Sequence, residues 1–355
     1  MADVGLIKSL IEAAASDKGI TFISQSESDT LSYASLYEYA RRLAVIFQEK
    51  GAKPGELIVL QCDNCRNFVV AFWACLLGGY ISIPLDVNRI QPMHRTDVSS
   101  LGSRFIVYDK SSGLDKEQLD EGMISVCICD YDLTKEPSKN TVLSEICHQN
   151  PDENIVYIMY SSGSTGERTG IITHEKTIFA DILGIIERLR MDKSDVSLTW
   201  QPLTHCYGLV AMHLLPVVLG IDQYIMKTEE FMMSPLLWAE AATLYGATRL
   251  GTIPFAMKHF VRAYRRSKGS FDWDLSGVKS ILTGAEQITL SLCNELESIL
   301  LEYGLRKNTV TPLYGLAETV TIAALHAPGE TVCEHMISRS DIEIGKRYRY
   351  VICCE

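Results

Sequence analysis

The sequence predicts an α/β fold with mostly parallel sheets covered by helices on both faces. Short runs of β-branched and apolar residues alternate with longer segments of helical period. The run Ile155-Val-Tyr-Ile-Met-Tyr160 has strand length and no alternation of apolar and polar residues, which is typical of a central parallel strand buried on both faces. With 355 residues, 47% of them hydrophobic, the chain can bury a sizeable core in roughly two folding units.

The first clear helix is expected to begin at Ser35-Leu-Tyr-Glu38, which has the pattern of a capping box, and to end at Gly51. Further helices are expected at residues 67–77, 178–189, 209–219, 235–245, 254–265 and 290–301. Strands are expected at residues 57–61, 80–84, 104–108, 125–129, 155–160, 196–198, 223–226, 279–283 and 309–312.

Composition limits the classes of partner. The net charge of -11 argues against a protein held to nucleic acid or anionic lipid by its overall field. The N-terminus lacks a secretory pattern, and the longest apolar stretch, 208–221, is too short to span a bilayer. We therefore expect a soluble, cytoplasmic protein. Cys62 and Cys65 form one CxxC without a second ligand pair, so we assign the cysteines no metal.

The strongest local signal for chemistry is a loop rich in serine, threonine and glycine after the expected strand 155–160. At the carboxyl end of a parallel strand, such a loop lies where α/β proteins bind ligands. Its backbone N–H groups and hydroxyls can surround a polyphosphate, although the same residues also suit a flexible polar turn. It is not a Walker loop, because no GKS or GKT follows the glycines. The candidate phosphate-binding residues are Ser161, Ser162, Gly163, Ser164, Thr165 and Gly166.

Residues 160–170 resemble the phosphate loop of the adenylate-forming superfamily, which includes acyl-CoA synthetases, fatty acyl-AMP ligases and adenylation domains. Segments 200–208, 283–286 and 314–318 match further motifs of that superfamily in the same order. The resemblance implies two stacked, doubly wound, mostly parallel sheets. It also implies the substrates ATP and a carboxylic acid, with Mg²⁺ as cofactor.

The resemblance gives roles to residues in these segments. His205 matches a histidine beside the acyl pocket, although a lone histidine would more simply be a core residue. Residues Gly284, Ala285 and Glu286 match a stretch whose backbone passes along the adenine, although an ordinary strand-to-helix turn would look the same. Residues 253–257 match a region that lines the acyl pocket, with plain core packing as the equal alternative.

The segment Tyr314-Gly-Leu-Ala-Glu318 carries the most specific of these roles. The resemblance implies that Tyr314 and Gly315 lie against the adenine ring and that Glu318 binds magnesium, a role that suits a hard carboxylate oxygen. We treat His205 and Glu318 as the catalytic candidates. Ala317, where many members carry threonine, makes the motif most similar to fatty acyl-AMP ligases and polyketide-type loading ligases.

The chain departs from the pattern in two ways. Thr169 stands where a lysine is expected, which should weaken ATP binding unless Arg168 replaces that cation. The sequence ends at Glu355, before most of the small β-barrel and the C-terminal lid domain that the resemblance implies. We therefore expect an N-terminal part, with a large-domain core at 1–335, made of two subdomains (55–190, and 1–54 with 191–335), and the start of a β-barrel at 336–355.

The resemblance implies an acid–thiol ligase that activates a hydrophobic carboxylic acid as acyl-AMP. Coenzyme A or the phosphopantetheine of an acyl carrier protein would then accept the acyl group. The alternative is a degenerate module of the same fold that binds nucleotide or a partner protein without catalysis. A Rossmann-type dehydrogenase is not expected, because GxGxxG does not follow an early strand.

Overall fold

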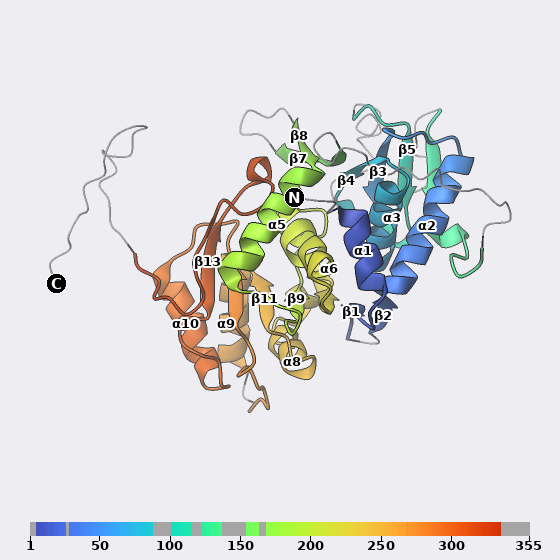
Figure 1. Ribbon diagram of the computed structural model, residues 1–355. Coiled ribbons are helices and arrows are strands. Elements are labelled where there is room, and N and C mark those ends of the chain that lie inside the picture. The colour runs from blue at the N-terminus through green and yellow to red at the C-terminus, as the bar shows by residue number, and fades with distance from the viewer. Residues whose placement is uncertain are drawn as a thin grey trace, which may run out of the picture.

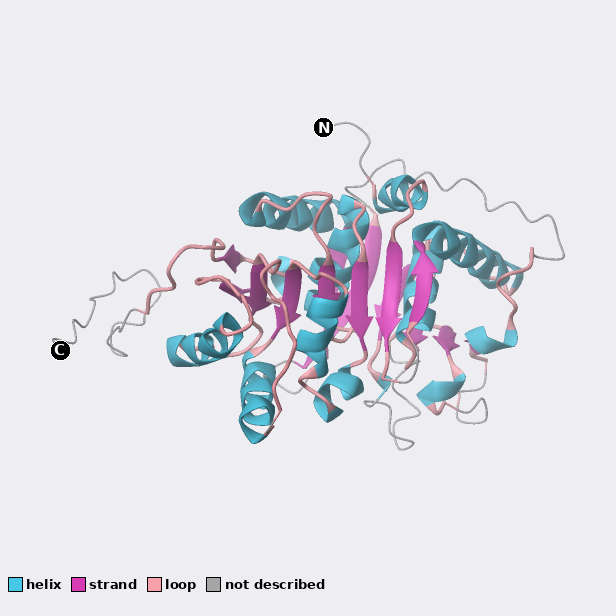
Figure 2. Ribbon diagram, turned by 90° about the horizontal axis from the view of Figure 1, so that it is seen from below, coloured by secondary structure: helices cyan, strands magenta, loops and turns pink. Residues whose placement is uncertain are grey.

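The computed structural model describes residues 5–25, 28–87, 101–114, 119, 122–136, 154–162, 168–267 and 269–334. Two sheets form the centre of this part of the chain, and helices cover them on both sides (Figure 1, Figure 2). The expected α/β fold with two mostly parallel sheets is confirmed. Within the described ranges, every helix is too short or too polar to cross a membrane.

The first sheet has six strands in the order β6-β5-β3-β4-β7-β8. All neighbours pair in parallel except β7 and β8, which form an antiparallel hairpin. The strands are β3 (Leu57–Gln61), β4 (Ile81–Pro84), β5 (Phe105–Tyr108), β6 (Ile124–Cys127), β7 (Ile155–Ser162) and β8 (Arg168–His174).

The second sheet has eight strands in the order β14-β13-β12-β11-β9-β10-β1-β2. Its six inner strands are parallel, and the edge strands β2 and β14 pair antiparallel to their neighbours. The strands are β1 (Gly19–Ile23), β2 (Asp29–Ser32), β9 (Ser197–Thr199), β10 (Gln223–Met226), β11 (Arg249–Thr252), β12 (Ser280–Thr283), β13 (Val310–Tyr314) and β14 (Ala324–Leu325).

The helices pack against these sheets, and a π-helical segment, Tyr207–Leu214, runs directly into α6. The α-helices are α1 (Leu6–Ala14), α2 (Tyr33–Glu49), α3 (Cys65–Leu77), α5 (Glu175–Leu189), α6 (Leu215–Leu219), α7 (Thr228–Met233), α8 (Leu237–Leu244), α9 (Pro254–Arg266) and α10 (Leu290–Leu301). Short 3₁₀ turns lie at Lys110–Ser112, Ile128–Asp130 and Ala317–Thr319.

Two of the sequence-based boundaries were wrong. Helix α2 begins before the expected capping box, because Ser32 is the N-cap residue and its side chain accepts a hydrogen bond from the amide of Ser35. The expected helix 209–219 is not one α-helix. Pro216 has no backbone N–H to donate, so an α-helical hydrogen-bond ladder cannot run unbroken through this position.

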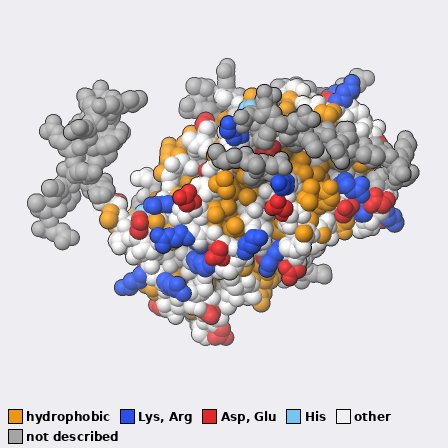
Figure 3. Space-filling model, in the orientation of Figure 1, with side chains coloured by type: hydrophobic (Ala, Val, Ile, Leu, Met, Phe, Trp, Pro, Cys, Tyr) orange, Lys and Arg blue, Asp and Glu red, His pale blue; other side chains and the backbone are white. Residues whose placement is uncertain are grey.

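One hydrophobic core cluster contains side chains from both sheets and their helices, such as Phe72 on α3 and Val210 in the π-helical segment. On the face in Figure 3, the Lys and Arg side chains lie mixed with Asp and Glu. The division of the core into subdomains at 55–190 stays a prediction. The expected β-barrel start, 336–355, lies outside the described residues.

A buried polar network ties the two sheets together. The indole of Trp73 on α3 donates to Nε2 of His213 at 3.0 Å, and His213 Nδ1 lies 2.8 Å from Oε1 of Gln223 on β10. Gln223 in turn donates to the hydroxyl of Tyr33 at 2.8 Å. Because the indole can only donate, Nε2 accepts and the His213 ring carries its proton on Nδ1. Burial lowers the pKa of His213 to about 4, so the network holds a neutral imidazole.

This network predicts a specific dependence of stability on pH. The folded-state pKa of His213 lies below its ordinary value of 6.5, so the unfolded state takes up the proton first as pH falls. The contribution of His213 to the free energy of unfolding is therefore complete above pH 6.5 and is lost as pH falls towards 4. We expect His213→Gln to show a shallower loss of stability across this window. Urea denaturation at several pH values measures the free energy of unfolding of both proteins. An equal dependence of this free energy on pH in the two proteins would contradict the prediction.

Candidate functional site

The carboxyl ends of β12 and β13 bring two predicted site segments together. The strands are parallel neighbours, with Thr283 opposite Pro312. Ala285 and Tyr314 each follow that pair by two residues, so both lie just beyond the same edge of the sheet. The Tyr314 side chain is 65% exposed, and Ala285 is exposed with a left-handed φ of 66°. An accessible aromatic ring thus stands beside an open backbone turn.

The two glycines of these segments allow close contact between backbones. A Cβ atom on Gly284 would lie 2.3 Å from the Leu313 side chain. On Gly315 it would lie 1.7 Å from the carbonyl oxygen of Thr321, which cannot move without shifting the chain. Gly315 is therefore required for the tight turn that carries Glu318.

Glu318 lies in the 3₁₀ turn Ala317–Thr319 and is exposed to solvent. The residue that follows this turn, Val320, has a left-handed φ of 69°. Such a backbone is unfavourable for a β-branched residue, and strain of this kind concentrates at functional sites. An exposed carboxylate suits Mg²⁺, which proteins commonly hold with one or two carboxylates and phosphate oxygens of the substrate. The described residues contain no cluster of three or more acidic, histidine or cysteine side chains that could hold a metal unaided.

The His205 segment lies against the segment that carries Glu318. The hydroxyl of Thr321 donates to the carbonyl oxygen of Cys206 at 3.4 Å, and the hydroxyl of Tyr207 donates to the carbonyl of Leu282 on β12 at 2.9 Å. Burial raises the pKa of Cys206 to about 11, with Asp181 and Glu318 adding to the rise. His205 is exposed, and its Nδ1 accepts from the amide of Tyr207 at 3.2 Å.

Glu286 links the expected adenine segment to the expected acyl segment. Its Oε2 accepts from the amide of Phe255 at 2.9 Å, in the first turn of α9. A carboxylate at a helix N-terminus is favourable for the helix dipole. Phe255 is 48% exposed, whereas Pro254 and Met257 are buried. Most of residues 253–257 therefore pack in the core, and Phe255 is the most exposed residue of that segment.

The predicted phosphate loop is described only at its base. Ser161 and Ser162 end β7, and Ser162 pairs with Arg168 across the hairpin. Gly163, Ser164, Thr165 and Gly166 lie outside the described residues, so their contact with phosphate stays a prediction. Thr169, in place of the expected lysine, is exposed on β8.

The sequence-based interpretation did not include Thr321 or Asp181. Asp181 is half-buried on α5, and burial raises its pKa to about 6, while polar contacts with Ile322 and Thr321 oppose the rise. The sequence holds a signal for it. Asp181 lies three residues after Ile178 and four before Ile185, both buried on α5, so a carboxylate lies within the apolar stripe of an amphipathic helix. Thr321 had no such signal, because its contact with Cys206 spans 115 residues.

A comparison with known protein families identifies the family of this chain. The model of the AMP-binding enzyme family matches residues 10–344. The chain belongs to this family. It spans about half the length of the curated relatives that it matches. A medium-chain-fatty-acid–[acyl-carrier-protein] ligase, JamA of Moorena producens, is 26% identical over 88% of this chain and 54% of the relative.

Two further comparisons agree with this membership. A protein of Mycobacterium tuberculosis named as a fatty-acid–CoA ligase is 25% identical over 92% of this chain and 58% of its own length. The crystal structure of a fatty acid AMP ligase from Legionella pneumophila superposes with a TM-score of 0.84 over 98% of this chain and 61% of that chain. At 22% identity, this structure shows that the fold is shared. The expected resemblance to the adenylate-forming superfamily is thus confirmed.

The tight turn at Gly315 leads to a prediction about stability. Gly315→Ala would place a methyl group against the Thr321 carbonyl, so we expect the free energy of unfolding to fall by roughly 1 to 3 kcal/mol. Gly277→Ala is the matched control, because a Cβ there meets no atom within 4 Å. Urea denaturation of the three proteins measures the difference, and equal effects of the two substitutions would contradict the packing described.

Proposed function

We propose that the protein carrying this chain activates a largely hydrophobic carboxylic acid with ATP as an acyl-adenylate. The convergence of separate segments carries the proposal. The register of β12 and β13 sets Ala285 beside Tyr314. The hydrogen bond from Thr321 to Cys206 brings the segment that carries Glu318 against the segment that carries His205. Residues from three distant parts of the sequence therefore converge on one edge of the sheet, as a nucleotide-dependent site requires.

In the proposed reaction, a carboxylate oxygen of the acid attacks the α-phosphorus of ATP. The bond from that phosphorus to the oxygen bridging to the β-phosphate breaks, and pyrophosphate leaves with the bonding electrons. The products are acyl-AMP and pyrophosphate. Displacement at phosphorus asks the protein chiefly to position the reactants and to neutralise charge.

The residues of the site divide this work. The exposed ring of Tyr314 offers a face for the adenine, and the backbone of Gly284 to Glu286 offers polar groups at its edge. The exposed His205 would lie at the mouth of the acyl site, and the loop after β7 would hold the β- and γ-phosphates. Glu318 would hold magnesium, which supplies charge neutralisation when it is bound.

The names of the relatives and residues 253–257 support proposals for the carboxylic acid substrate and for the acceptor of its acyl group. The names of the relatives specify fatty acids, and their acceptors include both CoA and an acyl carrier protein. The exposed Phe255 beside Glu286 suits an apolar acyl chain. The acceptor of the acyl group is therefore proposed to be the thiol of CoA or of a carrier-protein phosphopantetheine, and the setting is proposed to be cytoplasmic.

A second candidate function is a non-catalytic module that binds nucleotide or a partner protein. Thr169 favours it, because this exposed β8 residue replaces the cation expected beside the triphosphate. The two candidates share the nucleotide site and differ in the chemistry that follows binding.

Catalysis is tested by pyrophosphate exchange. With Mg²⁺, ATP and a panel of medium- and long-chain carboxylic acids, we expect the protein carrying this chain to incorporate labelled pyrophosphate into ATP. Glu318→Gln should lower the rate by at least 100-fold, because the metal loses its carboxylate ligand. Glu240→Gln, which alters an exposed carboxylate on α8, should leave the rate unchanged. Exchange that survives in Glu318→Gln would overturn the role of Glu318, and binding of ATP without exchange for any acid would favour the non-catalytic module.

The replaced loop lysine gives a gain-of-function prediction. Thr169→Lys restores a cation beside the expected triphosphate, so we expect affinity for Mg·ATP to rise about tenfold. Ser291→Lys adds the same charge on the exposed face of α10 and serves as the control. Calorimetric titration measures both. An equal rise in the two variants, or none in Thr169→Lys, would show that Thr169 does not face the phosphates.

A further inference from the structure

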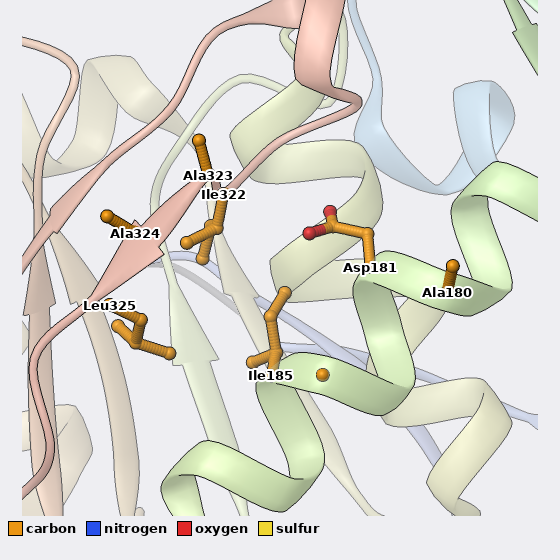
Figure 4. Close-up of a pocket in the computed structure, with 8 residues that line it drawn as sticks. Ala180, Asp181, Ile185, Ile322, Ala323, Ala324 and Leu325 are labelled. Carbon is orange, nitrogen blue, oxygen red and sulfur yellow. The ribbon is translucent and has the colours of Figure 1, made fainter.

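A pocket of about 290 Å³ lies between α5 and the chain segment that follows the Glu318 turn (Figure 4). One wall comes from α5 and the other from residues at and just before β14. Its lining residues are Ala180, Asp181, Gly184, Ile185, Ile322, Ala323, Ala324 and Leu325. Asp181 is the one charged side chain among them, and the other side chains are apolar or absent.

The carboxylate of Asp181 points from α5 towards Ile322 across this pocket (Figure 4). The amide of Ile322 and the hydroxyl of Thr321 donate to this carboxyl group. Its Oδ2 atom is nevertheless buried and has no hydrogen-bond partner of its own among the described residues. An unpaired buried carboxylate oxygen is unfavourable, and native proteins satisfy nearly all such atoms. Burial also raises the pKa of this carboxyl, which shows that its surroundings disfavour the charge. A ligand that donates a hydrogen bond would remove this cost.

The pocket adjoins the site where the acyl group is proposed to lie. Asp181 interacts electrostatically with the thiol of Cys206, the residue next to His205. The same thiol interacts with Glu318, and Thr321 contacts both Asp181 and the carbonyl oxygen of Cys206. A substrate whose carboxylate sits near His205 therefore has this pocket within reach of its remaining atoms.

We infer that the pocket between α5 and β14 selects acids whose far end carries a hydrogen-bond donor, and that Asp181 is the specificity-determining residue. The inference rests on the proposed function and narrows its substrate class from hydrophobic acids in general to apolar acids with a hydroxyl or ammonium group. An acyl chain that ends in a methyl group would occupy the pocket and leave Oδ2 unpaired. A chain of the same length that ends in a hydroxyl or ammonium group would occupy it and donate to the carboxylate. Sites with a buried hydrogen-bonding group reject analogues that lack the partner far more strongly than they reject differences in size alone.

The test uses non-hydrolysable acyl-adenylate analogues, in which a sulfamate replaces the phosphate. For each acyl length from four to twelve carbons, three analogues end in a methyl, a hydroxyl or an ammonium group. Binding to the protein that carries this chain is measured by calorimetric titration. At the length that reaches the pocket, we expect the hydroxyl or ammonium analogue to bind at least tenfold more tightly than the methyl analogue.

Two substitutions and a control assign the effect to Asp181. Asp181→Leu should reverse the preference in favour of the methyl end. Asp181→Asn, which keeps the shape and an accepting oxygen, should retain the preference for hydroxyl and lose that for ammonium. Glu187→Gln changes an exposed carboxylate on the same helix and should alter neither. Circular dichroism checks that each variant is folded. If Asp181→Leu does not fold, the near-isosteric Asp181→Asn variant decides the outcome.

The outcomes separate this inference from the proposed function. If analogues bind but those with a methyl, hydroxyl or ammonium end bind equally at every acyl length, the inference is overturned and adenylate binding stands. The same holds if the methyl analogue binds most tightly. If the preference persists in Asp181→Leu, another group causes it and the inference is also overturned. If no analogue binds, the proposed function and the inference both fail.

Discussion

The parallel register of β12 and β13 is the constraint on which the candidate site depends. Parallel strands send their carboxyl ends to one edge, so residues that follow equivalent positions emerge side by side. Thr283 opposite Pro312 fixes the partners, and Ala285 and Tyr314 follow from it. A shift of one residue in this register would turn the inward side chains of one strand outward. The core beneath β12, with Ile281 fully buried, therefore holds the site in register.

The turns at this edge are unfavourable by themselves and depend on the packing below them. Ala285 and Val320 both have left-handed backbones, although neither is glycine. Gly315 approaches the Thr321 carbonyl so closely that no side chain fits. Such conformations persist only where surrounding contacts over-determine them. The bond from Thr321 to the Cys206 carbonyl and the pairing of β13 with β14 provide those contacts.

The sequence predicted the parts of this structure that depend on local pattern. The order of the motifs identified the family before any contact was known. The apolar run Ile155 to Tyr160 did form a strand, but the expectation of a central parallel strand buried on both faces was wrong. Strand β7 lies next to the edge strand β8 and pairs with it antiparallel, so Ile158 and Tyr160 are only partly buried. The strands β1, β2, β8, β11 and β14 were not predicted. Four of them have two to five residues, which carry too little periodicity to stand out. The seven-residue β8 begins within the segment 160–170, which was interpreted as a phosphate loop. The start of α2 was misplaced because Ser32 and Ser35 are both good N-caps, and the strand that precedes the helix selects Ser32. The contact of Thr321 with Cys206 could not be predicted, since only the folded chain brings these residues together.

The anchoring of the two sheets supports the proposed site, which would combine the edge of one sheet with a loop from the other. The expected phosphate loop follows β7 in the six-stranded sheet, whereas Tyr314 ends β13 in the eight-stranded sheet. Both sheets must keep a fixed separation for one nucleotide to meet both. The neutral His213, bonded to Trp73 on one side and Gln223 on the other, supplies a directional link, and the ion pair of Lys227 with Asp63 at 2.6 Å supplies another. Apolar contacts alone would allow the two sheets to shift relative to one another. The hydrogen bonds of a buried polar network can all form in one arrangement only. The precision of the site thus rests on polar bonds that lie outside it.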